Sequence, residues 1–179
     1  MLFVSTVRDV VNQIVRSALP SRLRGRRRPE PVLGPGQPGP YATTQAHHVG
    51  HVATSYNPST DGDPDPGEIV WTWVPYEEND GRGKDRPVLV VAREPAGTVL
   101  AVQLSSQAHD DNVGWVPVGT GAWDGEGRPS WANLSRVLRV HEQGMRREAA
   151  SLDRERFDRV VAGLRHRCGR GLKRAVPGS

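Results

Sequence analysis

The chain has 179 residues, and its 20 glycines and 15 prolines, with 36% hydrophobic residues, leave little apolar material for a core along the whole length. Its single cysteine, Cys168, excludes an internal disulfide bond. No run of about 18 uncharged apolar residues is present, so we expect no membrane-spanning helix.

The positive charge of the chain is concentrated at its N-terminus. Residues 1–40 hold seven arginines against Asp9 and Glu30, which leaves 17 of the 24 basic and 18 of the 20 acidic residues for the rest. The basic character therefore belongs to the first segment, and the remainder does not have the charge of a strongly basic nucleic-acid-binding domain.

Apolar residues recur at helical spacing over residues 2–19, opposite a polar face that includes Arg8, Asp9 and Arg16. This pattern predicts an amphipathic helix over 1–19. Residues 20–66 are first basic and then rich in proline and glycine, which predicts a disordered linker. We expect this N-terminal segment to be a solvated tail. The alternatives are contact with an anionic membrane surface, with a partner or, non-specifically, with nucleic acid.

The pattern changes at Gly67. Short β-branched or aromatic runs, separated by turn residues, predict antiparallel strands in a barrel or a sandwich: EIVWTWV, RPVLVVA, TVLAVQLSS, VGWVPVG and SRVLRV. Ser151 can cap a helix whose apolar stripe includes Leu152, Phe157 and Leu164, and Gly169 can end it. We therefore expect a mainly β domain over 67–170 with a C-terminal helix, followed by a disordered tail over 171–179.

Arg86 stands where a polar, glycine-rich loop meets the apolar run RPVLVVA. Pro87 biases it towards extended backbone geometry, so its side chain is presented from a stiff position. A guanidinium binds phosphate oxygens bidentately and stays charged at any working pH. The simpler interpretation is a solvated charge paired with a neighbour such as Asp85.

Three motifs in order carry a family resemblance: the opening strand Gly67-Glu68-Ile69-Val70-Trp71, the pair Arg86-Pro87, and Leu104-Ser105-Ser106-Gln107. Together with the late SRVLRV strand and the final helix, residues 67–168 resemble the MazF/PemK toxins of type II toxin–antitoxin systems. The resemblance implies a small SH3-like antiparallel β-barrel that forms a homodimer in the cytoplasm. It also implies cleavage of single-stranded RNA without a metal or cofactor, inhibited by a cognate antitoxin in the RNA groove.

By this resemblance the catalytic residues are Arg86, which would bind and polarise the phosphate, and Ser105, which would orient it, with Ser106 as the alternative hydroxyl. The 77–86 loop would help form the RNA groove. Bases stack on exposed aromatic faces, although a tryptophan in a small barrel also commonly fills the core. The predicted substrate-binding residues are Ser106, Gln107, Glu78, Lys84, Trp115 and Trp123.

A non-catalytic barrel that binds protein or nucleic acid is the alternative function. It is favoured by departures from the family pattern. The acidic pair Glu77-Glu78 lies farther before the arginine than usual, Ser135-Arg136 replaces a common Asp-Gln pair, and Ser105 replaces the frequent threonine. Growth arrest on expression would separate an active toxin from an inert barrel.

Overall fold

The computed structural model of the chain describes residues 37–49, 52–59, 63–168 and 172–174. All of them belong to the second of two compact units, Leu33–Ser179. The amphipathic helix predicted for 1–19 lies outside the described residues, and so does most of the basic part of the predicted linker. The surface that this segment would offer to a membrane, a partner or a nucleic acid lies outside them too.

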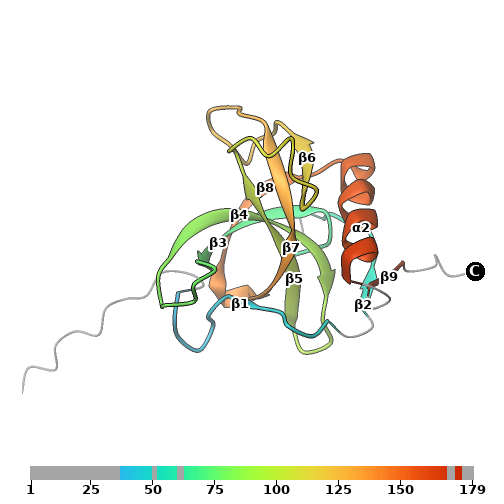
Figure 1. Cartoon of the computed structure of the whole chain (residues 1–179). Coiled ribbons are helices and arrows are strands. Elements are labelled where there is room, and N and C mark those ends of the chain that lie inside the picture. Colours follow the sequence, from blue (N-terminus) through green and yellow to red (C-terminus); the bar gives the residue numbers. More distant parts are fainter. Residues whose placement is uncertain (1–36, 50–51, 60–62, 169–171, 175–179) are drawn as a thin grey trace, which may run out of the picture. The chain divides into compact units, whose positions relative to one another are not determined.

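A single antiparallel sheet dominates the described residues (Figure 1). Its strand order is β1-β7-β5-β4-β3-β8, and β6 also pairs with β7. The strands are β1 (Thr44–Gln45), β3 (Glu68–Pro75), β4 (Gly83–Arg93), β5 (Thr98–Ser105), β6 (Trp115–Gly119), β7 (Ser130–His141) and β8 (Met145–Ser151), with a 3-10 turn, η1 (Glu142–Gly144), before β8. The sequence-predicted mainly β class with one C-terminal helix is confirmed.

The prediction of a closed barrel is wrong, because the hydrogen-bonded sheet does not close on itself. The sheet is strongly curved (Figure 1), but its order ends at β1 on one side and at β8 on the other. These two strands do not pair with each other in the described part of the chain, so the sheet is open. Short, polar β1 and charged β8 are edge strands, which explains why the sheet stops at them.

Both faces of the central strands are buried. Alternate residues of β4 and β5 belong to two apolar clusters, because successive side chains of a strand point to opposite faces. Leu89, Val91, Leu100 and Val102 face the cluster covered by the helix. The other cluster lies on the opposite face and comprises Val70, Val74, Val88, Val90, Val99, Ala101, Leu138, Val140 and Met145.

The helix α2 (Arg154–Cys168) packs against the first of these clusters. Its predicted apolar stripe is confirmed: Phe157, Val160, Val161 and Leu164 are buried, and Leu152 lies just before the helix. The cap differs from the prediction, because Asp153 rather than Ser151 accepts the N–H of Arg156, at 3.0 Å. No helix among the described residues is long and apolar enough to cross a membrane.

The structure differs from the disordered linker predicted for 20–66. Within that range β1 pairs with β7, and β2 (Val52–Thr54) pairs in parallel with β9 (Leu172–Arg174), which lies in the predicted tail. The buried hydroxyl groups of Thr43 and Thr72 are 2.8 Å apart. Ala46 and Val52 join the helix-covered core. A few apolar residues are enough to fix this segment, because they pack against a sheet that the rest of the chain already forms.

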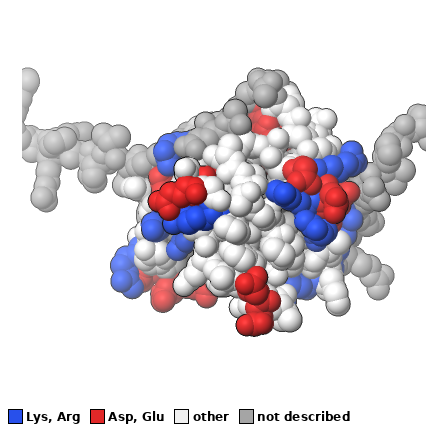
Figure 2. All heavy atoms as spheres, turned by 90° about the horizontal axis from the view of Figure 1, so that it is seen from above, with Lys and Arg blue, Asp and Glu red and all other residues white. Residues whose placement is uncertain are grey.

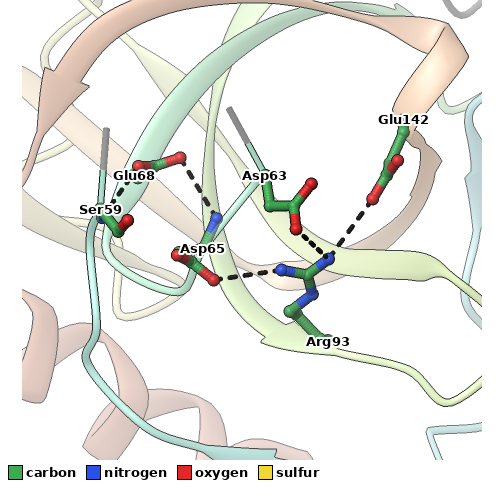
Figure 3. Close-up of polar contacts among 6 residues, drawn as sticks. All are labelled: Ser59, Asp63, Asp65, Glu68, Arg93 and Glu142. Carbon is green, nitrogen blue, oxygen red and sulfur yellow. Dashed lines mark hydrogen bonds and ion pairs between the residues drawn. The ribbon is translucent and has the colours of Figure 1, made fainter. Parts of the chain in front are cut away.

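An arginine clamp holds the segment before β3 in place (Figure 3). Arg93, at the end of β4, bridges three carboxylates: Asp63 at 3.8 Å, Asp65 at 3.2 Å and Glu142 at 3.4 Å. Glu68 then accepts the backbone N–H of Asp65 at 3.2 Å. The chain that leads into β3 is thereby fixed against β4 and the turn after β7.

Candidate active site

Arg86 lies inside β4, not at the start of a strand as predicted. The ladder between β3 and β4 continues to Pro75 opposite Gly83, and Arg86 is paired with Thr72. The preceding loop reverses the chain at Asn79 and Gly81, which both have positive φ angles. Arg86 is therefore held by a paired backbone on one side and by Pro87 on the other.

The guanidinium of Arg86 is half-buried and has no hydrogen bond or salt bridge to any described residue. Its sequence neighbour Asp85 instead accepts a hydrogen bond from Arg146 on β8, at 2.7 Å. Asp85 and Arg86 form no salt bridge with each other. The interpretation of Arg86 as a charge paired with Asp85 is therefore wrong.

Arg86 lines a groove of about 520 Å³ in which several predicted residues meet. The ends of β4 and β5 and the loop before β7 form its walls. The lining residues are Trp71, Lys84, Asp85, Arg86, Pro87, Leu104, Ser105, Ser106, Gln107, Trp123, Asp124, Gly125, Glu126, Arg128 and Ser130. The groove thus brings together Arg86, Ser105, Ser106, Gln107 and Lys84.

Ser105 ends β5 with its hydroxyl in a defined position. The hydroxyl oxygen accepts the backbone N–H of Gln107 at 3.1 Å. This turn contact uses a lone pair and leaves the hydroxyl hydrogen able to donate to a ligand in the groove. Ser106 is exposed, and no hydrogen bond from a described residue fixes its side chain. The local geometry therefore favours Ser105 over Ser106 as the positioned donor.

The acidic residues of the groove already have basic partners. Arg128 contacts both Asp124 and Glu126 at 3.1 Å, and Asp85 is held by Arg146. In the described part of the chain, Lys84 and Arg86 are the groove cations without a salt bridge. Figure 2 shows blue and red side chains next to one another on one face of the molecule. The groove therefore carries a local rather than a general positive charge.

A second hollow, of about 460 Å³, shares Arg86 with the groove. It is lined by Pro75, Tyr76, Glu77, Glu78, Arg82, Arg86, Gln103 and Arg136. Glu78, a predicted substrate-binding residue, is exposed here and has no hydrogen bond or salt bridge to a described residue. Arg86 is common to both hollows, so the groove and this second hollow are neighbours along one surface.

Arg136, on β7, was missed as a site residue. It is only 6% exposed, and its Nη1 donates to the carbonyl of Pro75 at 2.6 Å. Burial lowers the pKa of the Arg136 guanidinium, and the negative charge of Glu77 partly opposes this. The sequence did contain a signal: strand alternation places Arg136 on the face of buried Leu138 and Val140.

The two predicted tryptophans do not contribute as expected. Trp123 lines the groove but is only 4% exposed, and its indole N–H donates to Ser130 at 3.2 Å. Its faces are packed in the core, so the prediction that it stacks on a base is wrong. Trp115 lines neither hollow, and His109 already stacks on it, with ring centroids 3.7 Å apart and planes 5° apart. One face of Trp115 is therefore occupied.

No group of three or more His, Cys, Asp or Glu side chains is arranged to hold a metal ion within the described ranges. What the site offers is guanidinium and ammonium groups, a positioned hydroxyl and carboxylates. Such groups can bind a phosphate, orient it and accept a proton.

Residues 65–167 match the sequence model of the PemK-like, MazF-like toxins of type II toxin–antitoxin systems. This match spans more than half of the chain, and the protein belongs to this family. The resemblance drawn from the three motifs is confirmed. No curated protein matches the chain.

Solved structures show a similarity to this chain at low sequence identity. Two crystal forms of MazE–MazF from Deinococcus radiodurans each show 19% identity and a TM-score of 0.44, and cover 59% of this chain and 96% of theirs. An endoribonuclease from a mycobacterial species shows 13% identity and a TM-score of 0.43, and covers 64% of this chain and 97% of its own. The family assignment rests on the sequence match alone.

Proposed function

We propose that the protein is an endoribonuclease toxin that cleaves single-stranded RNA without a metal ion, using the 2′-hydroxyl of the substrate. The observation that carries the proposal is that Arg86 is unpaired in the described part of the chain and lies in the groove. In a chain of this toxin family, its guanidinium lacks a partner among the described residues and lines one groove with Ser105 and Lys84. An unpaired, rigidly presented guanidinium is suited to an anionic ligand such as a phosphodiester.

In the proposed reaction the 2′-oxygen attacks the adjacent phosphorus. The O2′–P bond forms, the bond from phosphorus to the 5′-oxygen breaks, and the electron pair of that bond leaves with the 5′-oxygen. The 2′-hydroxyl loses one proton and the 5′-oxygen gains one. The products are a 2′,3′-cyclic phosphate and a 5′-hydroxyl end, and no outside reactant is needed.

Arg86 would bind the non-bridging phosphate oxygens, where negative charge grows in the transition state. Preorganised donors at such a position commonly contribute a factor of about 10² to 10³ in rate. Ser105 would donate its free hydroxyl hydrogen to the same phosphate, and Lys84 would contact the chain beside it. Their joint effect is to hold the phosphate so that the attacking and leaving oxygens are in line.

Proton transfer requires an acceptor and a donor. Glu78 lines the hollow that adjoins Arg86, and no described residue holds its carboxylate, so it is our candidate to accept the 2′ proton. Arg86 would assist the departure of the 5′-oxygen by donating a hydrogen bond to it, and the proton that this oxygen gains would come from solvent water in the groove. The remaining carboxylates of the groove, Asp85, Asp124 and Glu126, have basic partners and are less available.

We also propose that a cognate antitoxin restrains the protein, that the active form is a homodimer and that it acts in the cytoplasm. Support for the antitoxin comes from the family, whose members are toxins of type II toxin–antitoxin systems. An antitoxin that covers Arg86 would block the phosphate site directly. A pull-down with the product of a neighbouring short reading frame, compared between wild type and Arg86→Glu, tests this contact.

The test of the enzymatic proposal is cleavage of a single-stranded RNA by the purified chain in EDTA. We expect cuts with 5′-hydroxyl ends, no cuts with Arg86→Ala, and no cut at a position where a 2′-deoxynucleotide replaces the ribonucleotide. Cleavage by Arg86→Ala at the wild-type rate would remove Arg86 from the mechanism. RNA that is bound but never cut would instead support the alternative, a non-catalytic binding module.

A further inference from the structure

Arg136 is a buried cation that forms no salt bridge with a described residue, although the negative charge of Glu77 acts on it from a longer distance. Among the described residues its Nε is buried and has no hydrogen-bond partner, and no carboxylate lies within 4.0 Å of its guanidinium. Its Nη1 donates a hydrogen bond to the carbonyl of Pro75. Removing a charged group from water is unfavourable unless a partner compensates for it, and a neutral carbonyl compensates only in part.

The surroundings of Arg136 indicate where a compensating charge would come from. The residue lines the hollow next to the groove, together with Arg86, Arg82, Gln103, Glu77 and Glu78. Arg82 is exposed and is already held by Asp80 at 2.6 Å. Two guanidinium groups without a salt bridge, those of Arg86 and Arg136, therefore flank one hollow.

We propose that Arg136 binds a second phosphate of the RNA, adjacent along the chain to the phosphate that Arg86 contacts. This inference rests on the proposed function, because it extends the track of the same substrate. An RNA strand carries one negative charge per nucleotide, so a run of separated cations along a groove matches it. The groove supplies Lys84 and Arg86, and the hollow supplies Arg136.

The carboxylates of the hollow favour RNA over an acidic peptide. Glu77 and Glu78 would repel incoming carboxylates and phosphates alike, so the preference for RNA comes from the groups that a ligand carries beside its negative charge. The bases of RNA carry amino and imino donors, which carboxylates can accept, beside phosphates that guanidinium groups can bind. A hollow with two guanidinium groups that lack a salt bridge to a described residue, and with two carboxylates, is thus suited to a nucleotide rather than to a uniformly acidic segment.

The test is binding of a fluorescent 2′-O-methyl RNA hexamer, which lacks the attacking hydroxyl and is not cut. Anisotropy is measured over a series of salt concentrations with wild type, Arg136→Gln and the matched control Arg159→Gln. We expect Arg136→Gln to bind about 10- to 100-fold more weakly, since one charge-assisted contact is lost. For this variant the slope of the logarithm of the RNA association constant against the logarithm of the salt concentration should fall in magnitude by about 0.7. This is the change expected when one phosphate contact on a single strand is lost.

Arg159→Gln should keep the wild-type slope, because this exposed arginine lies on α2, contacts Glu155 at 3.7 Å and lines neither the groove nor the hollow. Arg136→Met is the second variant, since an apolar side chain can replace a buried ion without loss of the fold. An unchanged slope and affinity in either folded variant would overturn the proposal. So would unfolding of both variants, which would identify Arg136 as a structural residue.

Two further outcomes separate this inference from its alternatives. If Arg136→Gln binds the RNA normally but no longer binds a hexaglutamate peptide that wild type binds, the hollow takes a carboxylate and the proposal is wrong. If wild type cuts unmodified RNA but the variant keeps its slope, only the inference about Arg136 fails. If wild type neither cuts nor binds RNA, the proposed function itself fails.

Discussion

Asp85 is paired with Arg146, at 2.7 Å, across strands β4 and β8. This pair withdraws the nearest carboxylate in sequence from Arg86. The guanidinium of Arg86 is therefore presented to the groove rather than consumed in a local ion pair. The distinction matters because an arginine bound to its neighbour would add to surface stability and would have little affinity left for a phosphate.

Replacement of Arg86 by alanine should separate activity from stability. No hydrogen bond or salt bridge to a described residue is lost with the guanidinium, so the free energy of unfolding should change by less than about 1 kcal/mol. Cleavage should fall by at least about 10²-fold. Arg86→Lys keeps the charge without the planar fork and should give an intermediate rate. Urea unfolding measures the stability of each variant, and cleavage of one RNA measures its rate. A loss of cleavage in Arg86→Ala that is explained by unfolding of the variant would contradict the assignment.

Ser105→Ala should lower kcat by about 10² with little change in KM, because its hydroxyl would act mainly on the developing charge. Ser105→Thr keeps the hydroxyl and should retain most of the rate. Ser151→Ala, an exposed serine at the end of β8, is the control for serine removal. Steady-state kinetics with a short RNA distinguishes these variants. A larger loss in Ser106→Ala than in Ser105→Ala would transfer the role to Ser106.

Gly121→Ala should destabilise the protein through Trp123. A Cβ at position 121 would overlap the indole ring, which is buried beneath the groove. Forcing extra volume into a packed site typically costs about 1–3 kcal/mol. Gly125→Ala is the matched control, since nothing lies within 4 Å of the Cβ that it would add. Thermal unfolding followed by tryptophan fluorescence should show a lower midpoint in the first variant and little change in the second.

The pair of Glu94 and Arg139 should make stability depend on pH. Arg139 donates to both oxygens of Glu94, at 2.6 and 2.7 Å, and these hydrogen bonds, together with one from Thr98, hold the pKa of Glu94 below its ordinary value of 4.5. Burial raises this pKa and only partly offsets the hydrogen bonds. The pair therefore stabilises the fold fully above pH 4.5, and its contribution is lost as the pH falls through the lowered pKa.

Glu94→Gln should thus cost about 1–3 kcal/mol at pH 7, and the difference from wild type should shrink towards pH 3. Urea unfolding at four pH values between 3 and 7 measures it. Glu155→Gln, in which an exposed carboxylate on α2 is replaced, should show no such trend. A constant difference between wild type and Glu94→Gln across this range would contradict the role given to the pair.

Local patterns predicted the strands and the helix where apolar residues decide the structure. The runs that became β3 to β7 are β-branched or aromatic, and the stripe of α2 is regular. The same criterion missed β8, because MRREAAS is charged and lacks β-branched residues. β8 forms because β3 offers it an unpaired edge. A local sequence pattern does not indicate where a partner strand will lie.

The candidate site was predicted in part for a similar reason. Arg86, Ser105 and their neighbours lie in short motifs that can be recognised in sequence. Trp123 was misplaced because composition does not tell whether an aromatic ring covers a core or faces a groove. Arg136 was passed over as a departure from a pattern, although its strand position indicates burial. Its relation to Arg86 depends on strands β4 and β7 lying on either side of β5 in the sheet.

The outer edge of β7 is covered in two portions that come from distant parts of the chain. Strand β6 pairs with residues 130–133, and the segment 44–46 bonds to residues 137–139. A shortened chain that started where the family match starts would leave the second portion bare. Bare backbone of this kind readily recruits another copy, so such a truncation would invite aggregation, and a failed assay on it would say nothing about the enzyme.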